Sequence, residues 1–194
     1  KFYQDYQGSI QIGQQELKDL SPSQVRQMIS YIPQDNTLFH GTLRENLLYG
    51  KNSGASEERL YDILEQLDLT KLVNELEKGI DTKISDSGTG LSEGQKQRFN
   101  IARAFMVDHP IYLLDEVTAS LDSVTESIIS KAIDKFTAGK TRLTIAHRLN
   151  TVREADYILV LNKNGSVSDF GKHQQLIQRN HLYNHFLSEL QVAG

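Results

Sequence analysis

The chain has 194 residues, enough to bury a sizeable core in one domain, with room for a subdomain. With 21 basic against 25 acidic residues its formal net charge is −4, and no cluster of Lys and Arg indicates a nucleic-acid partner. It contains no cysteine, which excludes a disulfide framework and a thiolate metal site, and its apolar runs are far shorter than the ~20 residues of a membrane helix. We therefore expect a soluble chain, and because it begins with Lys1 rather than Met, we expect a piece of a longer protein.

The first forty residues predict two short strands separated by a helix. A strand is expected over residues 9–12, with Gly13 at its turn. Ser21 and Pro22 are typical of an N-cap and a first helical position, so a short helix should follow them. The apolar run 29–32 is then the next strand.

Polar residues come directly after that second strand. Pro33 stops it, which places Gln34 and Asp35 at its carboxyl end, where open α/β sheets bind their ligands. An amide there can reach a metal ion or a water molecule. Taken alone, however, a glutamine in such a position is more often an ordinary loop residue.

The next fifty residues are expected to be mainly helical. Residues 37–50 place leucines and aromatic residues among polar ones, which fits either ordinary core or a partly exposed apolar patch awaiting a partner. Ser56 opens an amphipathic helix, and residues 68–76 should continue helical. Residues 79–90 are rich in Gly, Ser, Thr and Asp, which predicts a loop.

Ser92 and Gln95 have the spacing of a capping box, so Ser92 should cap a helix that runs through Arg103 toward Val107. Gly94 leaves the first turn without a side chain. A helix start of this kind can bind an anion such as a phosphate. The simpler alternative is a capped surface helix that binds nothing, and the cap alone favours that alternative.

A short apolar run ends in two carboxylates. Residues 111–114 are typical of a fully buried strand in a parallel sheet, and Asp115 and Glu116 follow at once. Hard oxygen ligands at the carboxyl end of such a strand suit Mg²⁺, and the second carboxylate can accept a proton from water. A solvated acidic turn is the alternative for a lone Asp-Glu pair.

The last third predicts a helix over 123–136, a strand over 141–146 with His147 at its carboxyl end, and an edge hairpin formed by 157–161 and 166–170. A lone histidine at a strand end is usually structural or solvated.

Two helices, around 172–178 and 181–190, should close the chain. His181 and His185 have metal-ligand spacing, but no third ligand is evident and a surface helix explains both.

The motifs together resemble the ATP-binding cassette (ABC) family of ATPases. They are LSEGQ, the apolar strand that ends in Asp115 and Glu116, and the segment Ala119, Ser120, Leu121, Asp122. PQDNTLFHGTLRENLLYG resembles the form found in exporters, and IAHRLNTVREAD matches the segment with the family's switch histidine. The resemblance implies an α/β fold of the P-loop NTPase (RecA-like) type, truncated at its N-terminus. It further implies a parallel sheet core from residues 1–34 and 110–170, an inserted α-helical subdomain over 35–109, and C-terminal helices over 171–194.

The resemblance also implies ATP and Mg²⁺ as cofactors and a role for each motif residue. Glu116 would position the attacking water as a base, Asp115 and Gln34 would hold Mg²⁺, and His147 would contact the γ-phosphate. The residues that would act on the nucleotide of a second copy, or cross-link the two sites, are Ser92, Gly94, Gln95, Ser120 and Asp122. The implied partners are a transmembrane domain and a second nucleotide-binding domain, identical or different, at the cytoplasmic face of the membrane.

Three departures from the family pattern stand out. Glu93 occupies the middle of LSGGQ, where its charge favours the helix dipole but repels phosphate unless the side chain points away. Asp86, Ser87 and Gly88 replace a Glu-Arg-Gly run. The P-loop G-x-x-x-x-G-K-[ST] is absent from this chain, and by family order it should end roughly ten residues before Lys1.

Two other functions therefore stay open. The first is a soluble cassette ATPase that acts in DNA repair or translation, and the second is a degenerate cassette that serves as a binding module.

Overall fold

The computed structural model describes residues 5–50, 54–84, 90–118, 121–146 and 148–192. The chain divides into two compact units, Lys1–Asp115 with Asp122–Thr144, and Glu116–Leu121 with Ile145–Gly194. We call these the first unit and the second unit. The predicted division into residues 1–34 with 110–170, 35–109 and 171–194 follows other boundaries and stays a prediction.

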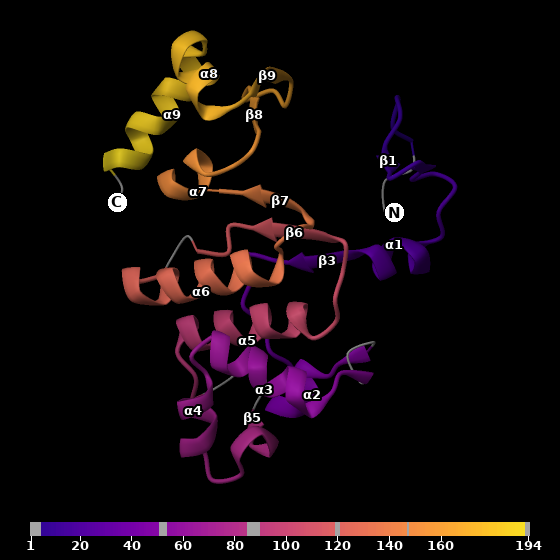
Figure 1. The fold of residues 1–194 in the computed structure, drawn as a ribbon, viewed down its shortest axis with the longest axis vertical. Coiled ribbons are helices and arrows are strands. Elements are labelled where there is room, and N and C mark those ends of the chain that lie inside the picture. The colour runs from indigo at the N-terminus through magenta and orange to yellow at the C-terminus, as the bar shows by residue number, and fades with distance from the viewer. Residues whose placement is uncertain (1–4, 51–53, 85–89, 119–120, 147, 193–194) are drawn as a thin grey trace. The chain divides into compact units, whose positions relative to one another are not determined.

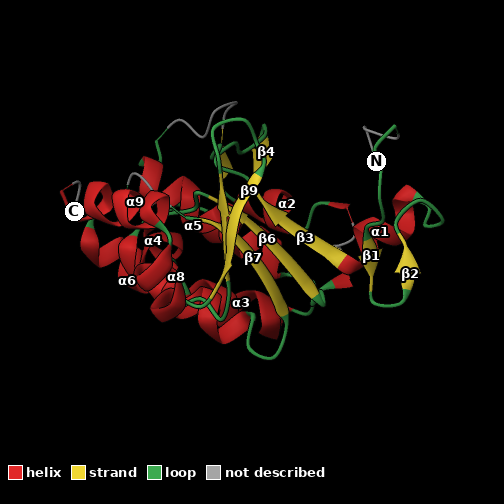
Figure 2. Ribbon diagram, turned by 90° about the horizontal axis from the view of Figure 1, so that it is seen from above, coloured by secondary structure: helices red, strands yellow, loops and turns green. Residues whose placement is uncertain are grey.

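A parallel sheet forms the centre of the first unit. Strand β3 (Ile29–Ile32) pairs in parallel with β6 (Ile111–Asp115), and β7 (Thr141–Ile145) lies on the other side of β6 (Figure 2). In the pairing, Ile29 lies opposite Ile111 and Ile32 lies opposite Leu114. Both predicted strands and the predicted α/β class are confirmed.

Two helices cover one face of this sheet, α5 (Glu93–Phe105) and α6 (Ser123–Phe136) (Figure 1). Successive side chains of a strand point to opposite faces, so burial alternates along β3 and β6. Ile32, Tyr112 and Leu114 are buried, whereas Tyr31 is 55% exposed. The prediction of a fully buried strand at 111–114 was therefore wrong, because only its alternate residues are buried.

Aromatic rings fill the core under the sheet. Phe105 lies with its ring centroid 4.8 Å from that of Phe136 and 5.5 Å from that of Tyr112, and all three are buried. Aromatic pairs of this kind contribute more free energy to stability than the burial of their apolar area alone.

The helical part of the first unit follows the predicted pattern with two differences. It contains α2 (Leu43–Leu47), α3 (Glu57–Gln66) and α4 (Thr70–Glu75). Asp68, with a positive φ of 50°, lies between α3 and α4 and separates them. The loop predicted over 79–90 contains a short 3₁₀ turn, η2 (Gly79–Asp81), and a strand, β5 (Lys83–Ile84), that pairs with β4 (Gly41–Thr42).

At the N-terminal end, the strand predicted over 9–12 is the first arm of a small hairpin. It consists of β1 (Gln11–Ile12) and β2 (Gln15–Glu16), with Gly13 in the left-handed region at φ 62°. Helix α1 (Pro22–Met28) then starts at the predicted cap, Ser21.

The second unit has its own small core of Val160, Leu176, Tyr183 and Leu187. The predicted hairpin is β8 (Ile158–Leu161) with β9 (Val167–Gly171), and the two predicted helices are α8 (His173–Arg179) and α9 (His181–Val192). A short helix, α7 (Leu149–Arg153), was not predicted. In the parts of the chain that the structure describes, no helix has the length and apolar character needed to span a membrane.

Candidate functional site

The N-terminal end of α5 is built as the sequence predicts. Ser92 has extended backbone angles, its Oγ accepts a hydrogen bond from the Gln95 N–H at 3.2 Å, and Gln95 Oε1 accepts one from the Ser92 N–H at 2.8 Å. The hydroxyl of Ser92 is thus part of the helix cap, and Gly94 adds no side chain to the same turn. The first turn combines the positive end of a helix dipole with a small, accessible backbone, which suits an anion.

Glu93 pairs with its own helix. Its carboxylate accepts a hydrogen bond from Lys96 Nζ at 2.8 Å, and its side chain is 72% exposed. The Lys96 side chain is only 15% exposed, and its charge offsets part of the negative charge beside the first turn.

The carboxyl ends of β3 and β6 bring Gln34 and Asp115 to the same edge of the sheet. Because Ile32 lies opposite Leu114, Asp115 ends its strand at the level of Pro33, next to Gln34 in the chain. Ligands of open α/β sheets bind at this edge. The sequence prediction that places these residues at one edge is confirmed.

Tyr31 is a neighbour of Asp115 that the sequence reasoning missed. Its hydroxyl donates to Asp115 Oδ2 at 3.0 Å, and this hydrogen bond raises the pKa of Tyr31. The signal was present in the strand alternation: the register pairs Tyr31 with Leu113, two residues before Asp115, so both side chains belong to the same sheet face.

These residues fit a bound Mg²⁺ in its usual protein setting. Among the described residues, no three His, Cys, Asp or Glu side chains are grouped closely enough to hold a metal ion by themselves. Mg²⁺ typically takes one or two protein oxygens and completes its shell with waters and substrate phosphates. One carboxylate from Asp115 and one amide oxygen from Gln34 are a donor set of that kind.

Glu116 begins the second unit in a conformation that is uncommon for its residue type. Its φ is 50°, in the left-handed region, and its backbone N–H donates to the Ile145 carbonyl at 3.1 Å. Backbone outliers of this type are frequent at functional sites. The predicted residues Ser120 and His147 lie outside the described residues.

Arg148 is a second residue whose role the sequence reasoning missed. Its Nη2 donates to the Leu121 carbonyl at 3.1 Å and lies 3.5 Å from the Thr118 carbonyl. It therefore holds both ends of the segment 118–121, which contains Ser120. Its place directly after His147 was the available signal.

Asp122 is the N-cap of α6 in the first unit. Its Oδ1 accepts from the N–H groups of Thr125 at 3.0 Å and Val124 at 3.1 Å. The Thr125 N–H in particular lowers the pKa of Asp122. The structure gives Asp122 a helix-capping role, and its predicted contact with a second copy stays a prediction.

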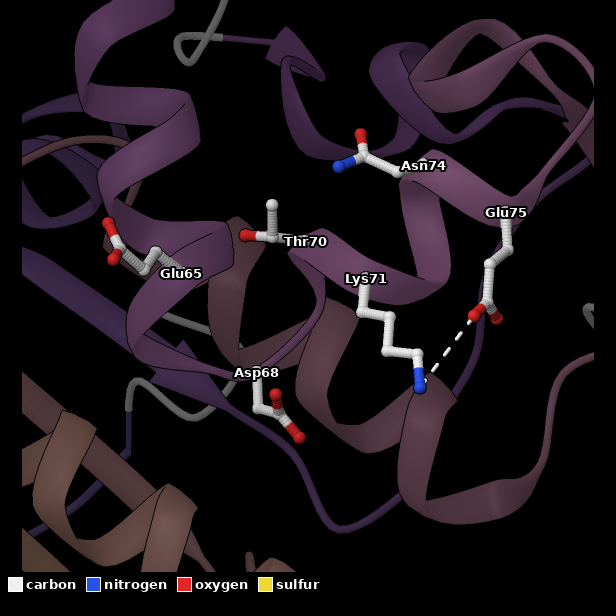
Figure 3. Close-up of a pocket in the computed structure, with 6 residues that line it drawn as sticks. All are labelled: Glu65, Asp68, Thr70, Lys71, Asn74 and Glu75. Atoms are coloured by element: carbon white, nitrogen blue, oxygen red, sulfur yellow. Dashed lines mark ion pairs between the residues drawn. The ribbon is translucent and has the colours of Figure 1, made fainter.

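A pocket of about 470 Å³ lies at α3 and α4, and its lining contains none of the predicted site residues (Figure 3). Its lining includes Glu65, Asp68 and Lys71, and Lys71 Nζ pairs with Glu75 across 3.8 Å. The ion pair lies within α4, and no residue of the sheet edge lines the pocket.

The fold and the motif positions define the class of protein. A parallel α/β sheet carries Gln34 and Asp115 at one edge, and the same unit carries the capped LSEGQ helix. The model of the ABC transporter family matches residues 1–119, and the chain belongs to this family.

The chain is similar to several proteins of that family. It is 44% identical over 183 residues to an uncharacterized ABC transporter ATP-binding protein of Bacillus subtilis, covering 94% of this chain and 32% of that protein. It is 38% identical over 194 residues to a multidrug resistance ABC transporter ATP-binding and permease protein of Lactococcus lactis, covering 100% of this chain and 33% of that protein. The human mitochondrial iron-sulfur clusters transporter ABCB7 is 41% identical over 181 residues, which are 93% of this chain and 24% of that protein.

Among solved structures, a bacterial Atm1-family ABC exporter with ATP bound has a TM-score of 0.88 and 33% sequence identity. The match covers 97% of this chain and 33% of that chain. The P-loop NTPase fold predicted from the motifs is thereby confirmed. The chain spans about a third or less of the length of these relatives.

Proposed function

We propose that this chain is part of the ATP-hydrolysing domain of an exporter-type ABC transporter. The observation that carries the proposal is that Gln34 and Asp115 share one sheet edge in the unit that also carries the Ser92 helix end. The structural match to an exporter with ATP bound, which covers 97% of this chain, supports the proposal.

In the proposed reaction, Asp115 and Gln34 hold the metal ion and Glu116 positions water. Bound Mg²⁺ would stabilise the charge that develops on the phosphates. Tyr31 donates to one oxygen of Asp115 and so orients the carboxylate, leaving the other oxygen for the metal ion. Glu116 follows Asp115 in the chain and acts as the base toward the attacking water.

The remaining motif residues act on the phosphate side. Ser92, Gly94 and Gln95 stabilise the γ-phosphate of a nucleotide held mainly by a second copy or a related domain. His147 contacts the γ-phosphate of the chain's own nucleotide, and Ser120 and Asp122 link the two sites. Arg148 holds the segment that contains Ser120.

The exposed surface of residues 37–50 is where the transmembrane domain docks in this proposal, on the cytoplasmic side of the membrane. Leu38, Leu43 and Leu47 are buried, whereas Tyr49 is 67% exposed. The segment is thus part core and part exposed patch, as the sequence suggested.

Two experiments test the proposal. In the complete protein, Glu116→Gln should abolish turnover while leaving a closed, ATP-loaded dimer, and unchanged hydrolysis would remove Glu116 as the base. Calorimetric titration of the 194-residue chain with Mg-ATP should show feeble binding or none, because the chain lacks a P-loop motif. Micromolar affinity would contradict that expectation.

A degenerate cassette is the second candidate, and Glu93 is the observation that favours it. The charge of Glu93 would repel a phosphate, and the ion pair with Lys96 weakens that repulsion without abolishing it. Complete protein that binds Mg-ATP but hydrolyses none, with Glu116 intact, would support the degenerate cassette.

A further inference from the structure

Asn46 on α2 is a buried polar residue whose side chain is fully engaged. It is 1% exposed. Its Oδ1 accepts from the Phe39 N–H at 3.0 Å, and its Nδ2 donates to the Phe39 carbonyl at 2.9 Å and to the Thr42 carbonyl at 3.0 Å. The amide therefore satisfies both backbone groups of Phe39, as a neighbouring strand would.

Arg103 on α5 binds the same residue from the other side. Its Nε donates to the Asn46 carbonyl at 2.7 Å and its Nη2 to Asn46 Oδ1 at 2.9 Å. The guanidinium also lies 5.2 Å from the centre of the Phe39 ring, within cation–π range. Its planar fork allows one side chain to fix two atoms of Asn46 and the ring at once.

The element held in this way is the exposed aromatic surface. The rings of Phe39 and Tyr49 lie 4.9 Å apart, and Tyr49 is 67% exposed. Nothing in the reaction proposed above uses Asn46 or Arg103. Their bonds instead join this surface to the helix that begins at Ser92.

Helix α5 connects Arg103 to the end of the helix at Ser92. Arg103 follows Ser92 by about three turns, so it lies roughly 16 Å along a continuous helix from the end proposed to face phosphate. A packed helix moves as a unit, and buried polar networks fix one geometry more sharply than apolar contacts do.

We infer that Asn46 is a positioning residue that, through Arg103, ties the Phe39–Tyr49 surface to α5, so that phosphate binding at one end of the helix shifts the docking surface at the other. This inference rests on the proposed function and deepens it. In this inference Asn46 acts on the coupling between the two ends of the helix and not on the reacting atoms. Its effect is on the transmission of the binding event.

Hydrogen–deuterium exchange on the complete protein, read by mass spectrometry with and without Mg-ATP, tests the inference at both ends of the helix. A Glu116→Gln background prevents turnover. In the parent protein, Mg-ATP should slow exchange at residues 92–96 and change it at 37–50. With Asn46→Ala, the change at 37–50 should shrink by roughly threefold or more, while that at 92–96 persists.

A second variant covers the case in which Asn46→Ala does not fold. Asn46→Asp keeps an acceptor for the Phe39 N–H and for Arg103 but loses both donors. The exchange response at 37–50 should therefore decrease in this variant by about half of the decrease expected for Asn46→Ala. Asn74→Ala on α4 is the matched control, because Asn74 is exposed, and it should leave both responses as in the parent protein.

The outcomes separate this inference from the proposed function. A full response at 37–50 in either Asn46 variant overturns the inference. A parent protein that responds at 92–96 but not at 37–50 also overturns it, without affecting the proposed function. No response at either end in the parent overturns both.

Discussion

The two ends of α5 are held by different kinds of interaction. At the N-terminal end, the side chains of Ser92 and Gln95 each accept a hydrogen bond from the other's backbone N–H, and Glu93 pairs with Lys96. At the C-terminal end, Phe105 is fully buried, and its carbonyl accepts hydrogen bonds from Arg59 on α3, at 2.6 Å from Nη2.

This difference gives the two ends of α5 different roles: one anchors the helix in the core and the other can contact a ligand. The C-terminal end is built into the core, whereas Ser92 and Glu93 at the N-terminal end are exposed and held by neighbours in their own helix, which leaves them accessible to a ligand. A helix organised in this way can present its first turn to another molecule without disturbing the fold.

The largest effect is expected at the buried end. Phe105→Ala removes a ring that packs on Tyr112 and Phe136, and core truncations of this size cost about 3–5 kcal/mol of unfolding free energy. Chemical denaturation of the 194-residue chain measures it. Tyr61→Ala, at a residue that is 45% exposed, should change the unfolding free energy by no more than about 0.5 kcal/mol. Equal losses for the two variants would mean that Phe105 is not a core residue.

A substitution at the exposed N-terminal end of α5 should reduce the unfolding free energy far less than Phe105→Ala does. Ser92→Ala removes one helix cap, which costs about 1 kcal/mol. Ser92→Asn keeps a capping side chain and should be close to neutral in the same denaturation experiment. If the hydroxyl also serves phosphate, both variants should weaken hydrolysis in the complete protein, and normal hydrolysis with Ser92→Asn would leave Ser92 with the cap alone.

The same contrast explains what the sequence could predict. The capping box at Ser92 is encoded within four residues, so its pattern is visible in the chain. The bond between Tyr31 and Asp115 joins residues 84 apart, and that between Arg103 and Asn46 joins residues 57 apart. No local pattern encodes such pairs.

Strand pairing shows the same limit. The loop predicted over 79–90 was rich in turn residues, yet β5 forms there because β4, some forty residues earlier, offers it a partner. For the candidate site, the sheet edge followed from strand order and the motifs. The supporting residues Tyr31 and Arg148 became visible only in the folded chain.

A third, smaller effect compares two caps that differ in charge. Helix α6 begins at Asp122, whose pKa is lowered by the N–H of Thr125, whereas α5 begins at the neutral Ser92. A carboxylate with a depressed folded pKa contributes stability above its unfolded pKa and loses it as the pH falls through the folded pKa. Acidification should therefore shift the Thr125 amide resonance in NMR spectra while that of Gln95 stays constant. Asp122→Asn should abolish the shift, and a Gln95 amide that titrated in parallel would contradict the assignment.

The smallest effect on stability concerns Glu93, and it decides between the two candidate functions. Its ion pair with Lys96 is exposed on one side, so Glu93→Gln should change the unfolding free energy by only a few tenths of a kcal/mol, about 0.2–0.5 kcal/mol. The charge nevertheless lies in the turn that is proposed to face phosphate. If it repels the nucleotide, Glu93→Gln should raise the hydrolysis rate of the complete protein at low salt, and the gain should fade at high salt because ions screen exposed charges. Lys71→Gln is the control, since it breaks an exposed pair with Glu75 on α4, away from the first turn of α5, and should leave the rate unchanged. A hydrolysis rate that changes with neither the substitution nor the salt concentration would mean that Glu93, paired with Lys96, leaves the first turn of α5 as open to an anion as a glycine would.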